Sequence, residues 1–177
     1  MILAETAILC GIAVALIAQT PTSQPAPSRL HVSNTFDFNV NESQEKVAPL
    51  FGANRERVWA EGWNPQFVYP QPAEDRQGSV FQVTKGSHES TWITTIFDLA
   101  QGHIQHVYFI PDVTVVLIDV HLSPAPHVGT HVQVRYERTA LAPELNDYIR
   151  QQAEKDAQSA EEWRAAIERY FERAAVK

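Results

Sequence analysis

Three residues with the donor types of a metal centre lie on two segments that are expected to form neighbouring strands. Asp119, His121 and His131 offer one carboxylate and two imidazoles, which is a ligand set that binds divalent transition metals. A turn near Pro126 would place His121 across from His131, with Asp119 two residues away on the same face. The same row of side chains carries Arg135 and is typical of a solvated sheet surface. We therefore favour an ordinary surface and predict no bound metal.

Other residue types that could act in catalysis form no recognisable arrangement. His103 and His106 are three residues apart on an expected strand, so they point to opposite faces and cannot chelate one ion jointly. The only cysteine is Cys10, and no serine stands in a Gly-x-Ser-x-Gly motif. Glu61 and Tyr136 are candidate acid or base groups if they are buried. A solvated loop carboxylate and a core tyrosine are the simpler interpretations, and no catalytic residue is assigned.

The composition describes one globular domain with a short appendage and excludes several classes of partner. The chain has 177 residues, of which 44% are hydrophobic and 20% charged. It carries 14 Lys and Arg against 21 Asp and Glu, for a formal net charge of -7, so no basic surface for nucleic acid is expected. A single cysteine excludes an internal disulfide and a thiol-rich zinc site. We predict no cofactor.

The N-terminal segment differs in character from the rest of the chain. Residues 1–18 are a hydrophobic leader that resembles a signal peptide or a weak membrane anchor, but they lack a basic n-region. Residues 19–29 are a linker of Pro, Ser, Thr and Gln, and residues 30–175 form the single domain. We favour an exported or membrane-anchored protein, in which any contact with a membrane is made through the leader. The alternative is a cytoplasmic protein whose start codon is assigned too far upstream.

The elements that must position these side chains follow from hydrophobic periodicity and turn composition. Residues 30–40 alternate as a half-buried strand. Asn41 and Gln44 have the form of a capping box for a helix that ends at Gly52, a second helical piece covers residues 54–59, and the proline-rich residues 61–77 read as an irregular loop. Five further strands and two helices are then expected, at residues 79–85, 90–98, 103–110, 113–123, 130–139, 143–158 and 159–175. The short connections between these strands favour an antiparallel meander.

The pairing of the last two strands indicates which face of the sheet is buried. The turn near Pro126 sets three apolar pairs on the inner face, Val120 with Val132, Ile118 with Val134 and Val116 with Tyr136. The earlier hairpins, folded onto the same face, add further inward-facing residues, which are Trp92, Thr94, Ile96, Gln105, Val107 and Phe109. Thr94, Gln105 and Tyr136 are then isolated polar groups that need partners if they are buried.

Several segments resemble one superfamily in composition and order. The residues concerned are Glu61 to Pro65, Tyr69-Pro70, Gly78 to Phe81, Trp92 to Asp98, and Val132 to Tyr136 followed by Thr139 to Leu141. They resemble bacterial SRPBCC proteins, a superfamily that includes START-related lipid-transfer domains, birch-pollen-allergen-like proteins and the polyketide cyclase/dehydratase group. The resemblance implies an α+β helix-grip fold. In that fold a curved antiparallel β-sheet wraps around a long C-terminal α-helix, with two short helices after the first strand and a cavity between sheet and helix.

The expected cavity defines a candidate site and three alternative functions. Its lining would combine loop aromatics with inward-facing residues of the sheet, which are Trp59, Trp63, Phe67, Tyr69, Trp92, Thr94, Ile96, Val107, Phe109, Val134 and Tyr136. The favoured function is binding of a hydrophobic or aromatic small molecule, lipid-like or polyketide-like. The alternatives are a cyclase or dehydratase that uses the same cavity, and an interaction scaffold whose cavity has closed.

Overall fold

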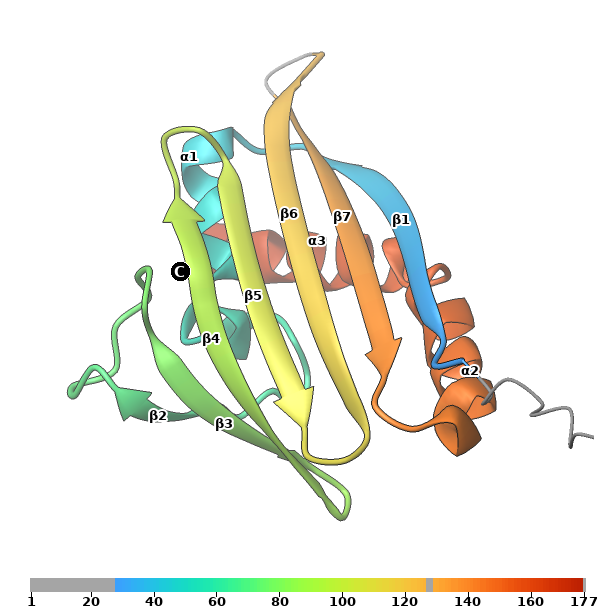
Figure 1. Ribbon diagram of the computed structural model, residues 1–177. Helices are drawn as coiled ribbons and strands as arrows, with labels where there is room; N and C mark the ends of the chain where they lie inside the picture. Colours follow the sequence, from blue (N-terminus) through green and yellow to red (C-terminus); the bar gives the residue numbers. More distant parts are fainter. Residues whose placement is uncertain (1–27, 127–128, 177) are drawn as a thin grey trace, which may run out of the picture.

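The computed structural model describes residues 28–126 and 129–176. The predicted leader 1–18, with Cys10, lies outside the described residues, as does nearly all of the predicted linker 19–29. Figure 1 shows one curved antiparallel sheet with the long helix α3 crossing its concave side. Within the described residues no helix is long and apolar enough to cross a membrane.

In the described part of the chain, seven strands, three α-helices and three short 3-10 helices follow one another. Before the first hairpin they are β1 (His31–Val40), α1 (Gln44–Val47), η1 (Ala48–Phe51), η2 (Arg55–Val58) and β2 (Gln66–Tyr69). The meander consists of β3 (Val80–Lys85), β4 (His88–Asp98), β5 (His103–Ile110), β6 (Thr114–Ala125) and β7 (Gly129–Ala140). The chain then forms η3 (Pro143–Leu145), α2 (Asn146–Asp156) and α3 (Ala160–Ala175). The order across the sheet is β1-β7-β6-β5-β4-β3-β2.

The first strand closes the sheet against the last one. Phe36, Phe38 and Val40 are buried while the residues between them are exposed, so the predicted alternation is confirmed. β1 runs antiparallel to β7 with Phe36 opposite Val134. Figure 1 shows β1 and β7 side by side, with α3 passing behind them.

Three local predictions before the meander are corrected, two of them because of the prolines. Pro49 lies in the first turn of η1, where its missing N–H is tolerated, and the predicted helix therefore breaks into α1 and η1. The N-cap of α1 is Ser43, without a side-chain capping bond, so the predicted capping box at Asn41 does not form. The predicted irregular loop contains the edge strand β2, because Pro65 and Pro70 flank that strand instead of interrupting it.

The β6–β7 hairpin keeps the predicted faces but not the predicted pairs. Ala125 pairs with Gly129, so the turn is centred one residue further along the chain than predicted. Val120 therefore lies opposite Val134 instead of Val132, a shift of two residues. Because side chains alternate with a period of two, this shift leaves Val120, Val132 and Val134 on the buried face.

A β-bulge in β4 and the register of β5 correct four inner-face assignments. The bulge between Thr94 and Ile96 places Ile96 opposite Gln105 on the outer face, and the following residue, Phe97, packs against the core in its place. On β5, Ile104, His106 and Tyr108 face inward, so the predictions for Gln105, Val107 and Phe109 are wrong as well. Phe109 is 40% exposed.

The C-terminal segment restarts its helix where the sequence predicted an interruption. α2 ends at Asp156 and α3 begins at Ala160, with Ser159 as the N-cap. The Ser159 hydroxyl donates to the carbonyl of Lys155 and does not cap α3. α3 places fully buried Ile167 against the core and partly buried Trp163 beside it.

Candidate functional site

The concave face of the sheet contains a group of ionisable and phenolic side chains that we call the inner polar cluster. It consists of Glu56 from η2, Tyr108 from β5, Tyr136 and Arg138 from β7, and Asp156 from the end of α2. Tyr136 and Arg138 are two residues apart on one strand, so both point inward. The cluster lies among aromatic rings of the core.

A buried ion pair holds one side of the inner polar cluster in place. Arg138 donates from two nitrogens to the two carboxylate oxygens of Asp156, with Nη2 2.8 Å from Oδ1. The guanidinium also donates to the Tyr108 hydroxyl, with Nη1 2.9 Å from Oη. Burial disfavours the charged guanidinium, but the hydrogen bonds to Asp156 hold the pKa of Arg138 above its ordinary value. The pair fixes the end of α2 against β7.

Both phenols of the cluster stay neutral at physiological pH. Burial raises the pKa of Tyr108, and the neighbouring Arg138 only partly opposes that effect. Burial also raises the pKa of Tyr136 well above its ordinary value, and the negative charge of Asp156 adds to the rise. Each hydroxyl therefore keeps its proton and can donate a hydrogen bond.

The Tyr136 hydroxyl has no hydrogen-bond partner among the described residues. Every fully buried side-chain nitrogen and oxygen in that part of the chain is partnered, so this hydroxyl must remain accessible to a molecule of water size. The ring itself is held by neighbours, with the Arg138 guanidinium 5.3 Å from its centroid and Phe36 stacked at 6.3 Å. The hydroxyl is thus fixed in position and free to bind.

Glu56 is the second group of the cluster without a hydrogen-bond partner in the described chain. Its side chain is half-buried. Because every fully buried side-chain oxygen in the described chain has a hydrogen-bond partner, the carboxyl oxygens of Glu56 are not sealed from solvent. Burial raises the pKa of Glu56 well above its ordinary value, and the charge of Asp75 adds to the rise. Glu56 lies near enough to Tyr136 for its charge to contribute to the raised pKa of that phenol. A carboxyl with a raised pKa next to a phenol can exchange protons with a bound molecule.

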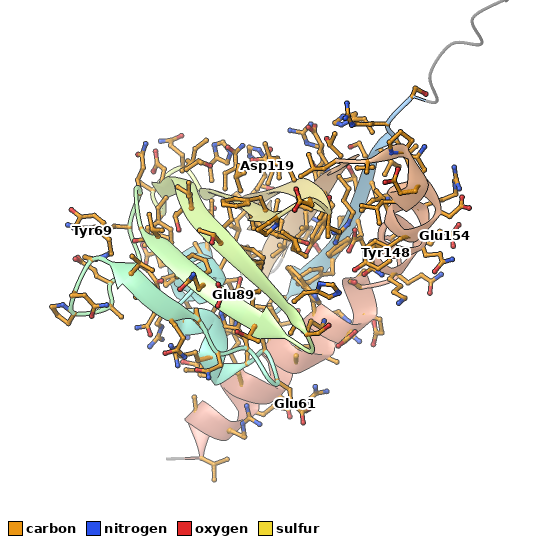
Figure 2. The ribbon with its side chains drawn as sticks, turned by 60° about the horizontal axis from the view of Figure 1, so that its bottom comes forward. Glu61, Tyr69, Glu89, Asp119, Tyr148 and Glu154 are labelled. Carbon is orange, nitrogen blue, oxygen red and sulfur yellow. The ribbon has the colours of Figure 1, made fainter. Side chains whose placement is uncertain are left out.

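Aromatic rings surround the cluster and keep part of their surface accessible. Trp92 stacks on Tyr108 with the ring centroids 4.1 Å apart. On the opposite side Trp163 of α3 makes edge contacts with Phe36 and Trp59. Trp92, Tyr108 and Trp163 all face the interior but are only partly buried. Figure 2, which views the molecule from the end of the sheet, shows the sheet arched over α3. We call the region between these rings the inner crevice; that it opens to hold a ligand stays a prediction.

Two hollows lie at the edge of α3 rather than under the sheet. One has a volume of about 880 Å³ and lies at the end of α3, and the other has about 260 Å³ and lies between η2 and α3. The second hollow is lined in part by Trp59 and Glu61. Trp59 is the only member of the predicted ligand site that lines either hollow.

The predicted loop aromatics take three different environments. Trp59 is buried in the core and donates its indole N–H to the carbonyl of Leu50 at 2.8 Å. Trp63 and Phe67 pack against Phe81 at the β2–β3 side of the sheet. Tyr69 is 54% exposed, and Figure 2 shows it on β2, away from α3. Of these rings, only Trp59 is part of the main core around the inner crevice.

The sheet residues of the predicted ligand site divide between the two faces. Trp92, Thr94, Val134 and Tyr136 face inward, and the structure places Ile96, Val107 and Phe109 on the outer face, as described above. Ligand contact by the inward-facing residues stays a prediction.

Sequence reasoning missed four of the five members of the inner polar cluster and found only Tyr136. Tyr108 was missed because the register of β5 was assigned to the wrong face. Arg138 could have been found from its position two residues after Tyr136 on the same strand. No sequence pattern connects Glu56 or Asp156 to the cluster. Glu61, the carboxylate that the sequence did single out, is exposed.

Buried His106 links the sheet to η1 at the edge of the main core. Its Nε2 donates to the carbonyl of Phe51 at 3.0 Å, and its Nδ1 accepts from the Thr94 hydroxyl at 3.1 Å. The Phe51 carbonyl can only accept, so the proton of the neutral ring is on Nε2. Burial lowers the pKa of His106, and the hydrogen bond to Phe51 partly opposes that effect.

The outer face holds a group of two histidines and one carboxylate, as predicted, but His103 takes the place of His131. His131 lies opposite Ser123 and bonds Asn39, so it is not the partner of His121. Instead His103 on β5 is directly opposite His121 on β6. Burial opposes ionisation of Asp119, but hydrogen bonds from His103 and other donors lower its pKa to about 2. The carboxylate is therefore ionised at neutral pH.

Comparison with known proteins identifies the fold. No protein-family model matches the chain, and no curated protein sequence matches it. The structure is similar to norcoclaurine synthase from Thalictrum flavum, with a TM-score of 0.59 and 10% identity over 93% of this chain and 99% of that chain. It is also similar to Ara h 8.0201, with a TM-score of 0.59 and 16% identity over 79% and 97% of the two chains. A third similar structure is the Mll3558 protein from Rhizobium loti, with a TM-score of 0.54 and 17% identity over 81% and 99%.

The similar structures confirm the predicted α+β helix-grip architecture. They are helix-grip structures of the SRPBCC type, and this chain has the same seven-stranded antiparallel sheet with C-terminal helices. At these sequence identities the likeness is one of fold.

Proposed function

We propose that this helix-grip chain binds a small, largely aromatic molecule with at least one oxygen substituent in the inner crevice. The observation that carries the proposal is the Tyr136 hydroxyl, which is fixed in position and accessible but has no partner in the described chain. Because water can reach this hydroxyl, an oxygen atom of a ligand would replace a water molecule as its acceptor. Such an exchange contributes a net ~1 kcal/mol.

The surroundings of Tyr136 favour an aromatic ligand over a purely aliphatic one. Trp92 and Trp163 border the crevice and are only partly buried, and the Trp92 ring already stacks on Tyr108 and Phe81. Such surfaces favour stacked or edge-to-face contacts, worth about 0.5–1.5 kcal/mol per pair beyond area burial. Norcoclaurine synthase, which shares the fold, has been solved in complex with dopamine and hydroxybenzaldehyde. A chain with this fold can therefore hold hydroxylated aromatics.

The test compares a hydroxylated probe with its parent hydrocarbon. Isothermal titration of the wild-type chain should show 2-naphthol binding about fivefold more tightly than naphthalene, since one added hydrogen bond contributes ~1 kcal/mol. Tyr136→Phe removes only the hydroxyl, so it should abolish this preference while leaving naphthalene affinity unchanged. Tyr69→Phe is the matched control, because Tyr69 is exposed on β2. Figure 2 shows Tyr69 away from α3.

Two results would contradict the binding proposal. If neither probe binds saturably, the interior is closed and the chain is better described as an interaction scaffold. If Tyr136→Phe and Tyr69→Phe behave alike, the probe binds at another place on the surface.

Glu56 favours a second candidate function, which is acid–base catalysis on the bound molecule. A carboxyl whose pKa is raised by burial is a stronger base than an ordinary carboxylate, and Glu56 has no hydrogen bond in the described chain that would occupy it. The test is deuterium exchange at the α-carbon of 2-tetralone, followed by NMR in D2O. Exchange faster than the buffer rate, lost in Glu56→Gln but kept in Glu61→Gln, would support catalysis. Exchange at the buffer rate would leave binding as the function.

A further inference from the structure

We propose that His103, Asp119 and His121 form a binding site for a divalent transition-metal ion on the outer face of the sheet. The site is independent of the inner crevice, because the three side chains point to the opposite face of β5 and β6. Figure 2 shows Asp119 on the side of the sheet away from α3. The ligand set of two imidazoles and one carboxylate suits Zn²⁺ and its neighbours in the transition series.

The three ligand atoms already converge without an ion. His103 and His121 are directly opposite in the β5–β6 ladder, and their rings stack with centroids 4.1 Å apart. Both rings aim Nε2 at the same carboxylate, His103 at 2.8 Å from Oδ1 and His121 at 3.3 Å from Oδ2 of Asp119. All three ligand atoms lie within 4.8 Å of one another.

This geometry needs only a small adjustment to hold a metal. Zinc bonds nitrogen at about 2.0–2.1 Å, so ligand atoms in a tetrahedral site are about 3.3 Å apart. The His121 nitrogen is already at this distance from Oδ2, and the His103 nitrogen is somewhat closer to Oδ1. The carboxylate must therefore bind through both oxygens or rotate, and the two Nε2 atoms must approach each other. The His121 side chain is 53% exposed, so its ring can move into place. Its exposure also leaves the fourth coordination position open to water.

Arg135 is the group that an ion must displace. Its Nη2 lies 3.2 Å from Oδ2 of Asp119, and its positive charge opposes a cation there. The guanidinium is 43% exposed and also pairs with Glu137. The guanidinium can therefore move away from Asp119 and remain paired with Glu137. Removing this charge with Arg135→Gln should tighten metal binding severalfold, a result that a metal bound elsewhere would not give.

The experiment is isothermal titration of ZnCl2 into the untagged full-length chain after treatment with EDTA and buffer exchange. We expect saturable binding. We also expect His103→Ala and His121→Ala each to raise the dissociation constant for Zn²⁺ at least about tenfold. The matched control is His131→Ala, which removes a histidine from the same face without touching the site. Cobalt substitution should give the visible absorption of a four-coordinate site in the wild type and lose it in His121→Ala.

The result that overturns the proposal is Zn²⁺ affinity that is unchanged in His121→Ala, or no saturable Zn²⁺ binding by the wild type. Circular dichroism and thermal unfolding without metal establish that each variant is folded. His121→Gln is the second variant at that position, because it keeps a polar side chain that can still bond Asp119. Zinc affinity in His121→Gln equal to that of the wild type would also overturn the proposal.

Discussion

Loss of the Asp156 carboxylate should be among the most damaging single changes to this protein. Asp156 and Arg138 are almost sealed from solvent, with side-chain exposures of 12% and 9%. Asp156→Ala leaves a buried guanidinium whose remaining partner is the neutral Tyr108 hydroxyl. Removing one member of a buried ion pair costs about 3–5 kcal/mol of unfolding free energy. For a chain of this size that corresponds to a fall of roughly 6–20 °C in the thermal midpoint.

The measurement is urea unfolding followed by tryptophan fluorescence, and a double variant decides its interpretation. Arg138→Met with Asp156→Leu replaces both charges by apolar groups, and we expect it to be within about 1 kcal/mol of the wild type or more stable. Glu161→Ala, which removes an exposed partner of Arg164 on α3, is the control and should leave the midpoint unchanged. If Asp156→Ala costs less than about 1 kcal/mol, the guanidinium is hydrated and our description of the pair as buried is wrong.

Three further predictions test other parts of the structure. Burial lowers the pKa of His106, so the unfolded chain binds the proton more readily and stability should fall as the pH drops below about 6.5. His106→Gln should therefore reduce the change in the urea unfolding midpoint between pH 7 and pH 5. If the midpoint changes as much in His106→Gln as in the wild type, the pH dependence belongs to other groups. Gly102 has φ of 64° and a Cβ there would lie 2.5 Å from a strand carbonyl oxygen, whereas Gly86 has φ of 62° and open space around it. Gly102→Ala should therefore destabilise the fold by at least about 1 kcal/mol more than Gly86→Ala, and equal costs would show that the clash is relieved. Finally, Phe97→Ala should cost about 3 kcal/mol in chemical unfolding and Phe109→Ala less than about 1 kcal/mol, and the reverse order would restore the face assignment made from the sequence.

The architecture was predictable because the strongest periodic patterns belong to the elements that define it. From Phe36 to Val40 in β1 and from Val132 to Tyr136 in β7 every second residue is apolar and buried, and this alternation fixes which face is inside whatever the pairing register. The restart of the C-terminal helix at Ser159 was also visible in the sequence. The order of strands in a meander then follows from short connections, so the helix-grip fold needed no long-range information.

The site was less predictable because it depends on features that have no periodic signal. The bulge between Thr94 and Ile96 changes the face of every later residue in β4. The turn before Gly129 is centred one residue away from the expected position, and this difference separates His121 from His131. Asp156 and Glu56 reach the interior from helices far away in the sequence, which only tertiary packing can determine.

The register of β5 illustrates how polar groups decide what hydrophobic alternation leaves open. One face of β5 offers Ile104, His106, Tyr108 and Ile110, and the other offers His103, Gln105, Val107 and Phe109, so each face mixes apolar and polar groups. The observed choice gives His106 two hydrogen bonds inside the protein. It also brings two donors, His103 and Gln105, to the nearly buried carboxylate of Asp119.

The opposite register would bury His103 and Gln105, which now bond Asp119 on the outer face. It would also expose His106 and Tyr108, which now form hydrogen bonds inside the protein. An unpartnered buried polar group costs about 1–3 kcal/mol, so the loss of these hydrogen bonds opposes the alternative register. The same pairing therefore places Tyr108 beside Arg138 on the inner face and His103 beside His121 on the outer face. The inner polar cluster and the proposed metal site thus depend on one β5–β6 register, although they lie on opposite faces of the sheet.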